Sequence, residues 1–474
     1  MATSGPTKRA CDECHAVKEK CRRSDPSAVC ERCSRIGQYC QTVRCAVKPG
    51  RKSKMSKKVP YTLPTSSASI ALTSFPTCEK TALSLPCLSW NSGLASNPMI
   101  LSDLDPVERH FLNLMKDILA PSPLDKFLVC PSFHESDHSL FIQNIIQPTS
   151  VVRNATVACA AVFFRDQLPE YSKPSVEIGH RRAALALSAL RSFKISGERD
   201  LVTALILGVA MVTFAMHVAE GQPYLISHYT LSLIKSQHMD LSTLDPSMIG
   251  FLMCLTSTET FECLLRSSIP TMRVDLDGKD RVDRYLGLSS PILTYFYDIC
   301  EISCSIRHAK AVLPEILQRL NAIHAGVDQW QPSTPVDFLD HFTQAEVVAI
   351  LAQSRVLRLA ALLIIRRLYH PYGQYDLEAV MLSQAIIGEF EMVLQLTQRS
   401  IPCTELAYLV SCFELLGTDS RIRAIERSEH VITFSKQMRL RFQIILGSIW
   451  NARDRGCKFY WFELNDYVDT LGIQ

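Results

Sequence analysis

Six cysteines near the start of the chain are the residues whose type and spacing most clearly indicate a particular chemistry. They form two arrays of identical spacing, separated by eight residues: Cys11-x2-Cys14-x6-Cys21 and Cys30-x2-Cys33-x6-Cys40. Two cysteines with two residues between them can bind one ion, because the turn brings both sulfurs to the same side. Tetrahedral zinc takes four ligands and favours thiolates. The repeat therefore predicts a metal site built from all six cysteines.

The number of cysteines limits how such a site can be built. Two separate zinc tetrahedra need more ligands than six thiolates supply, so both are complete only if two cysteines bridge the ions. The cluster is then net negative, and basic side chains around it can offset the charge: Lys18, Lys20, Arg22, Arg23, Arg32 and Arg35. So short a segment has little core of its own, and structural zinc supplies on the order of 10 kcal/mol of folding free energy. We therefore expect two Zn²⁺ ions, and we expect chelators to unfold residues 8–45.

Other uses of clustered cysteines fit the sequence less well. A disulfide framework belongs to an oxidising compartment, whereas the polar stretch from Met1 to Arg9 lacks the pattern of a signal peptide. RING and LIM sites normally need more ligands and often a histidine, and His15 does not extend the repeat. A thioredoxin-like Cys-x-x-Cys would follow a strand, and none is evident here. Cys45 breaks the repeat and is expected to be a bystander.

The distribution of charge separates the start of the chain from the rest. The whole chain carries +3, but residues 1–58 carry +10 and residues 59–474 carry −7. A basic segment on a mildly acidic body suggests a polyanionic partner. The basic tail, residues 46–58, includes the run from Lys48 to Lys58. We favour a nuclear localisation signal with phosphate contacts for it over a solvated, disordered charge run.

The expected secondary structure changes along the chain. Residues 59–100 contain 18 Ser, Thr or Pro among 42 positions and indicate a disordered linker. From Leu101 onward apolar residues recur at helical spacing, without sustained alternation of period two. The clearest helical patterns are Val176–Phe193, Leu201–Ala219, Gln344–Tyr369, Leu377–Leu396 and Met438–Ala452. We predict a mainly α protein, with a small N-terminal zinc domain at 8–45 and a large all-α domain at 101–474.

Proline, glycine and capping residues mark the expected ends of these helices. Breaks are expected at positions that include Pro174 and Gly197. The first helix of the body is expected after a cap at Asp103 or Asp105, with Pro106 in its first turn. Its apolar residues, from Leu104 to Ile118, are too few for the three or four heptads of a stable coiled coil. We therefore favour a helix of the core.

One apolar stretch raises the question of a membrane. Leu201–Ala219 has no formal charge over a length that can span a bilayer. It contains Thr203, Thr213 and His217, and charged residues directly precede it. No other stretch is expected to resemble it. We favour a buried core helix with no membrane contact, and His217 as a core residue with satisfied hydrogen bonds.

The cysteine array resembles the fungal zinc binuclear cluster DNA-binding domain. In that family the same six-cysteine pattern surrounds a variable loop, and all six positions match. The resemblance implies that Cys11 and Cys30 bridge both zinc ions, with one ion completed by Cys14 and Cys21 and the other by Cys33 and Cys40. It also implies two short helices, near Asp12–Lys20 and Glu31–Ile36, related by a pseudo-twofold axis, with Pro26 in the loop between them.

The same resemblance suggests how the module reads DNA. Lys18 corresponds to the lysine that contacts bases in the major groove, and lysine donates well to the O6 and N7 acceptors of guanine. The family tends to read CGG-like triplets. Lys20, Arg22 and Arg23 suit phosphates, which position a protein without specifying sequence. His15 and Val17 depart from the family pattern, which often has basic residues there, so we expect a flatter salt dependence.

The body resembles the helical regulatory domain attached to many fungal zinc-cluster factors. The resemblance rests on Ala361–Gly373, Ile449–Asp454 and Phe459–Phe462. No P-loop, G-x-G-x-x-G or H-E-x-x-H motif accompanies it, and core or surface roles account for His370, Cys300 and Cys304. No enzymatic activity is therefore expected. The aromatic run Phe459–Phe462, with Glu463, Asp466 and Asp469 after it, is interpreted as a packed helix end rather than an acidic activation segment.

Two classes of function are compatible with these features. The protein either binds DNA and recruits the transcription machinery, or forms an interaction scaffold that never reads DNA. The basic tail and Lys18 favour the first class. We predict a nuclear, zinc-dependent, sequence-specific regulator of transcription by RNA polymerase II. The expected partners are double-stranded DNA, the transcription machinery or co-regulators, and a second copy of the chain. The resemblance further suggests a metabolic or secondary-metabolite gene cluster as its target.

Overall fold

The computed structural model describes residues 10–11, 14, 20–22, 29–36, 40, 104–116, 123–137, 139, 150–165, 172–236, 244–275, 281–309 and 314–468. The chain divides into two compact units, Met1–Leu88 and Ser89–Gln474. The division falls within the stretch 59–100 that the sequence marks as a linker. That stretch and the basic tail at 46–58 lie outside the described residues.

The first unit holds a short helix beside its cysteines. Helix α2 spans Glu31–Ile36, as the sequence predicts, and Cys14 also has helical geometry. The rest of the other predicted helix, Asp12–Lys20, lies outside the described residues apart from Lys20. The N–H of Glu31 donates to the carbonyl oxygen of Arg22 over 3.1 Å. This bond ties α2 to the chain that follows Cys21.

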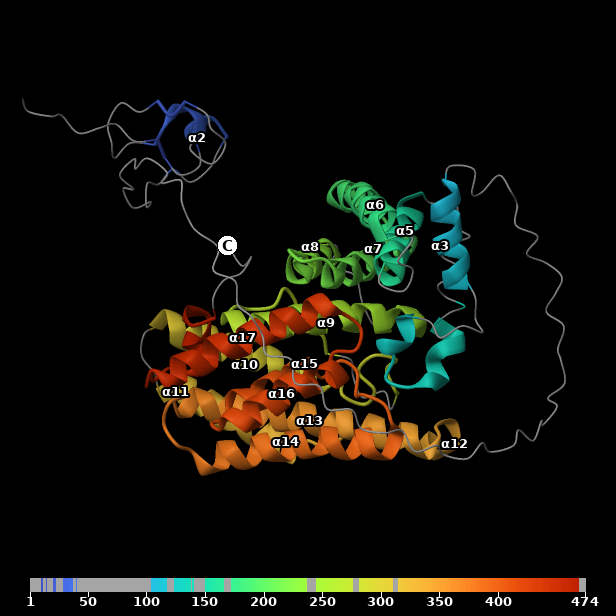
Figure 1. Ribbon diagram of the computed structural model, residues 1–474. Helices are drawn as coiled ribbons and strands as arrows, with labels where there is room; N and C mark the ends of the chain where they lie inside the picture. Colours follow the sequence, from blue (N-terminus) through green and yellow to red (C-terminus); the bar gives the residue numbers. More distant parts are fainter. Residues whose placement is uncertain are drawn as a thin grey trace, which may run out of the picture. The chain divides into compact units, whose positions relative to one another are not determined.

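In the part of the second unit that the structure describes, every named element is a helix or a 3-10 turn (Figure 1). Two isolated bridges, Asp283–Gly287 and Tyr372–Phe459, are its only β-type pairings among those residues. The prediction of an all-α body is confirmed. The helices are α3 (Pro106–Lys116), α5 (Ser150–Phe164), α6 (Ser172–Ser192), α7 (Glu198–His217), α8 (Pro223–Lys235), α9 (Pro246–Arg266), α10 (Ile292–Ala309), α11 (Pro314–Gln329), α12 (Phe338–His341), α13 (Gln344–Tyr369), α14 (Leu377–Thr397), α15 (Glu405–Phe413), α16 (Thr418–Val431) and α17 (Lys436–Asp454), with short 3-10 turns η1 (Pro123–Lys126), η2 (Pro131–Phe133) and η5 (Trp461–Asp466).

Helix α13 forms the centre of this unit. It begins and ends at the predicted residues, and it starts with a capping box in which Thr343 and Glu346 each accept the other's backbone N–H. Most of its residues are buried, and it packs against α10, α11, α14 and α15. Helices α13 and α14 lie side by side in Figure 1. The other four predicted patterns overlap α6, α7, α14 and α17.

Two expected helix boundaries have different outcomes. The cap of α3 is confirmed at Asp105, whose carboxylate accepts the N–H of Glu108 over 2.9 Å while the Glu108 carboxylate accepts the N–H of Asp105. The break expected at Pro174 is wrong, because α6 already begins at Ser172. A proline is tolerated in the first helical turn, where its missing N–H would have had no partner within the helix.

In the described part of the body the helices pack around a large core, a smaller core and a third, minor cluster that includes Val129, Phe338 and Ile350. The smaller core joins α3, α5, α6 and α7, which also lie together in Figure 1. Leu104, Phe111 and Leu112 of the first segment are buried in it. The interpretation of this segment as a core helix is therefore confirmed over the described residues, which end at Lys116.

Among the residues that the structure describes, three helices, α7, α9 and α13, are long and apolar enough to cross a membrane by length and composition. The expectation that Leu201–Ala219 stands alone in this respect is wrong. Between 56% and 72% of the apolar window of each helix is buried inside the unit. His217 is buried, and its two ring nitrogens lie 2.8 and 2.9 Å from the carbonyl oxygens of Thr213 and Phe434. Packing in the core therefore accounts for the long apolar sequence of α7.

The C-terminal aromatic run closes the unit. Phe459 and Trp461 are fully buried, and the indole of Trp461 donates to the carbonyl oxygen of Leu264 over 3.0 Å. The N–H of Tyr372 donates to the carbonyl oxygen of Phe459 over 2.7 Å. The prediction that this run is packed is confirmed, but the run leads into the 3-10 turn η5 instead of ending helix α17, which stops at Asp454.

Candidate metal centre

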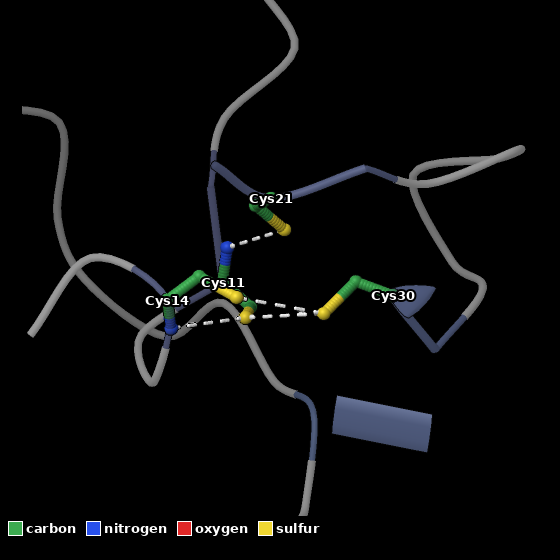
Figure 2. A group of neighbouring side chains, drawn as sticks. All are labelled: Cys11, Cys14, Cys21 and Cys30. Carbon is green, nitrogen blue, oxygen red and sulfur yellow. Dashed lines mark hydrogen bonds between the residues drawn. The ribbon is translucent and has the colours of Figure 1, made fainter. Parts of the chain in front are cut away.

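The six cysteines of the repeat come together in two overlapping groups. The sulfurs of Cys11, Cys14, Cys21 and Cys30 lie within 4.8 Å of one another, and so do those of Cys11, Cys30, Cys33 and Cys40. Both groups contain Cys11 and Cys30. Figure 2 shows the first group, with its side chains converging from separate segments of the chain. Each group has the number of thiols that one tetrahedral zinc requires.

The sulfur separations suit a tetrahedral ion. The Cys11 sulfur lies 3.8 Å from that of Cys30 and 3.7 Å from that of Cys33, and the sulfurs of Cys14 and Cys30 are 3.6 Å apart. Zinc–sulfur bonds of about 2.3 Å place two ligands of a tetrahedron about 3.8 Å apart. A disulfide bond would bring two sulfurs to about 2 Å. The donor set and its spacing therefore fit zinc.

Backbone N–H groups hold the sulfurs with the same pattern in both halves. Cys11 donates to the Cys21 sulfur over 3.4 Å, and Cys30 donates to the Cys40 sulfur over 3.3 Å. The N–H of Cys14 lies 3.4 Å from the Cys11 sulfur, and the N–H of Cys33 lies 3.4 Å from the Cys30 sulfur. Such bonds favour the thiolate and orient it for a metal. The repeat in the sequence is thus also a repeat in the structure.

The crowding of the sulfurs has an electrostatic consequence. Burial, with hydrogen bonds to Cys11 and Cys30, raises the pKa of the Cys14 thiol to about 12. Burial raises the pKa of Cys33 as well, whereas the N–H of Cys33 lowers the pKa of Cys30. Neighbouring thiolates repel one another, and a divalent cation reverses this balance by pairing with several of them. The cluster can therefore hold thiolates if cations share it.

The structure describes only part of the predicted DNA-binding set. Lys20 and Arg22 are exposed. Lys18 and Arg23 lie outside the described residues. In the body, Cys300 is buried in the core, while Cys304 is half-buried on α10 beside His308. Neither cysteine joins a group of potential metal ligands among the described residues.

The comparisons with known proteins concern the helical body. A family model described as the fungal specific transcription factor domain matches residues 128–472. No curated protein and no solved structure matches the chain. The matched residues begin beyond the cysteine cluster and include nearly all of the body's helices, from η2 to η5. This family implies a regulatory rather than an enzymatic role. The chain therefore belongs to the family of the fungal specific transcription factor domain, and it is a regulator of transcription.

Proposed function

We propose that this regulator is a nuclear, zinc-dependent transcription factor that binds specific DNA sequences through residues 8–45. The observation that carries the proposal is the pair of cysteine groups that share Cys11 and Cys30, on a chain whose body belongs to a family of transcription factors. The basic charge of residues 1–58 supports a polyanionic partner. Residues 101–474 form the regulatory domain, and residues 59–100 connect the two.

In this proposal all six cysteines are zinc ligands. Cys11 and Cys30 bridge two Zn²⁺ ions, because they belong to both groups. Cys14 and Cys21 complete the first ion, and Cys33 and Cys40 the second. Zinc, when bound, supplies folding free energy on the order of 10 kcal/mol or more. The backbone N–H groups of the cluster orient the sulfurs and stabilise their thiolate form.

Two kinds of basic residue then serve DNA binding. Lys18 contacts bases, with CGG-like triplets as the expected sequence, while Lys20, Arg22 and Arg23 bind phosphates. The exposed positions of Lys20 and Arg22 are compatible with this role. The basic tail at 46–58 adds phosphate contacts and a nuclear localisation signal. The regulated genes would form a metabolic or secondary-metabolite cluster transcribed by RNA polymerase II, with co-regulators recruited by the body.

Arrays of double-stranded DNA test this function against that of a scaffold that never reads DNA. We expect the zinc-loaded full chain to select a short motif, and we expect chelation to abolish the selection while the helical body stays folded. Lys18→Ala should cost about 1–3 kcal/mol at one base position. A uniform loss over all sequences would assign Lys18 to the backbone instead. Equal binding to all DNA, or none, would favour the scaffold.

We also infer that the factor works as a homodimer through an apolar stripe on α14. Four large side chains of this stripe are exposed: Leu377 by 59%, Met381 by 61%, Met392 by 37% and Leu396 by 65%. Exposed Ala385 and Gly388 lie between them. The order Leu, Met, Ala, Gly, Met, Leu and the spacings of four, four, three, four and four residues read almost the same in both directions. An antiparallel pair of such stripes matches itself about a twofold axis, which is the symmetry of most dimers.

Gly388 supports a second copy as the partner. A Cβ atom added to it would meet nothing within 4 Å, so no neighbour in the chain requires a glycine there. Glycine inside a helix costs about 0.5–1 kcal/mol relative to alanine. At the centre of an antiparallel pair, Ala385 and Gly388 let the axes approach to about 8 Å. The same register places Glu378 opposite Gln395 and Glu389 opposite Gln384, so like charges do not face each other.

Sedimentation equilibrium of the full chain tests the dimer. We expect a dimer for the natural chain and a monomer for Met381→Glu. Leu185→Glu is the matched control, since Leu185 is 49% exposed on α6, away from the stripe. A monomeric natural chain, or a dimer that survives Met381→Glu, would refute the α14 interface.

A further inference from the structure

A cavity of about 150 Å³ lies among α7, α9, α15 and α17, whose positions are labelled in Figure 1. Its lining is largely apolar and includes Val212, Phe261, Leu409, Phe442 and Ile445. A cavity of similar volume lined by aliphatic and aromatic side chains can bind a benzene-sized molecule. The space therefore suits a small ring compound.

The spacing of the lining residues shows that whole helix faces border the cavity. On α9 the lining includes Cys254, Thr258, Phe261 and Leu265, which recur at four, three and four residues and are all half-buried. Residues three and four apart share one face of a helix. Helix α9 packs against α7, α8, α10 and η5, and α17 packs against α7, α15 and α16. The cavity occupies the space that the α9 face leaves toward α15 and α17.

One polar group of the lining lacks a counter-ion. Glu405, in the first turn of α15, forms no ion pair with any described residue, although it is only half-exposed. Burial raises the pKa of its carboxyl to about 7. The backbone N–H groups of Glu405 and Cys403 lower this pKa, but by less than burial raises it. Near neutral pH the cavity therefore contains a carboxyl group that can ionise and still needs a cation.

The two basic groups of the lining already have partners. Arg441 pairs with Glu262 over 2.6 Å, and Glu262 also accepts from Arg266. Lys126 is exposed, and its ammonium lies 3.4 Å from the carbonyl oxygen of Thr433. Arg441 and Arg266 share the one Glu262 carboxylate, and neither they nor Lys126 form an ion pair with Glu405. A cationic ligand would find Glu405 unpaired.

We propose that this cavity is an effector site for a small apolar amine, whose ring fills the apolar space and whose ammonium group pairs with Glu405. The site goes beyond DNA binding, because it gives the regulatory domain a chemical signal to respond to. A ligand that binds only the folded domain stabilises it in proportion to its concentration above the dissociation constant. The ring supplies apolar burial, while the amine supplies selectivity.

Benzylamine, benzyl alcohol and benzoate test the site, because they share one ring and differ in charge. Binding to the full chain is measured by calorimetry at pH 8, where Glu405 is ionised. We expect benzylamine to bind at least tenfold more tightly than the other two compounds. Glu405→Gln should remove that difference while leaving benzyl alcohol binding unchanged, which also shows that the cavity is still folded.

A second carboxyl group provides the control. Glu315 lies exposed in the first turn of α11, so Glu315→Gln changes a similar residue that does not line the cavity. We expect no effect of this change on benzylamine binding. The proposal is overturned if none of the three compounds binds, if benzoate binds as tightly as benzylamine, or if Glu405→Gln keeps the preference for the amine.

Discussion

Arg367 offers a direct test of what stabilises the helical body. It lies in the family-like motif Ala361–Gly373 and is only 1% exposed. Its guanidinium donates to both carboxylate oxygens of Glu414, over 2.7 and 2.5 Å, and to the carbonyl oxygen of Pro371 over 3.0 Å. It also lies 4.7 Å from the centre of the Tyr372 ring. Arg367→Met keeps the apolar stem of the side chain and removes all of these contacts.

The expected loss of stability comes from the Glu414 carboxylate, which the substitution leaves without its partner. Glu414 is 4% exposed, so its carboxylate would stay buried without a counter-ion. Removing one partner of a buried ion pair costs about 3–5 kcal/mol. That is a large fraction of the roughly 5–15 kcal/mol by which domains are stable. Adding Glu414→Leu to Arg367→Met should recover much of the loss, because the stranded charge is then gone.

Urea unfolding of the full chain, followed by circular dichroism, measures these changes. Arg319 is the control, because its side chain is 55% exposed and pairs with Glu301, whose side chain is 33% exposed. Arg319→Met should cost at most about 1 kcal/mol, since solvent screens exposed pairs. A loss below 1 kcal/mol for Arg367→Met, or equal losses for both arginines, would refute this account of the core.

Three further predictions concern the glycine turn, the unpaired carboxyl group and the zinc ligands. Gly373 has φ +81°, and a Cβ atom there would lie 2.3 Å from the carbonyl oxygen of Cys457. Gly373→Ala should therefore lower the free energy of unfolding in urea by at least about 1–3 kcal/mol. Gly447→Ala is the control and should not lower it, because a Cβ atom there meets nothing within 4 Å. The pKa of Glu405 is raised to about 7 in the folded chain, whereas it is about 4.3 in an unfolded chain. The folded state holds this proton more tightly, so the free energy of unfolding falls as the pH rises between these two values, by up to about 3–4 kcal/mol. Glu405→Gln should therefore raise the urea midpoint at pH 8 and change it little near pH 4, and an equal effect at both would contradict the shift. Cys11→Ser removes a proposed ligand of both ions, so it should lower the zinc content measured by atomic absorption by more than Cys14→Ser does. Cys45→Ser is the control and should leave the zinc content unchanged. Equal zinc content in all three variants would exclude the bridging role of Cys11.

The sequence was a good guide where local chemistry decides the structure. The strict period of Gln344–Tyr369 and the Thr343–Glu346 cap set both ends of α13 without help from the rest of the chain. The spacing of the six cysteines likewise brought them into two groups, because short segments allow few other arrangements. The prediction at Pro174 is wrong because a proline is compatible with the end of one helix and with the first turn of another. Only the packing of α6 distinguishes these two cases.

Features that depend on distant segments could not be read from the sequence. The partner of Arg367 lies 47 residues away on the chain, and nothing in either segment marks them as a pair. The cavity was missed for the same reason, since its walls come from four helices and Glu405 is an ordinary residue in the sequence. The apolar lengths of α9 and α13 were also overlooked, because scattered charged or polar residues interrupt them.

The way in which the aromatic run closes the body has a consequence for how the protein is made. Trp461 bonds to Leu264, which lies 197 residues earlier in the chain. A ribosome that adds about 5–20 residues per second needs about 10–40 seconds to make that stretch. During this time the segment around Leu264 that Trp461 later contacts lacks that partner in the nascent chain. We therefore expect the unfinished body to need chaperones, and a stop codon just before residue 459 to remove the regulator by degradation rather than to shorten it harmlessly.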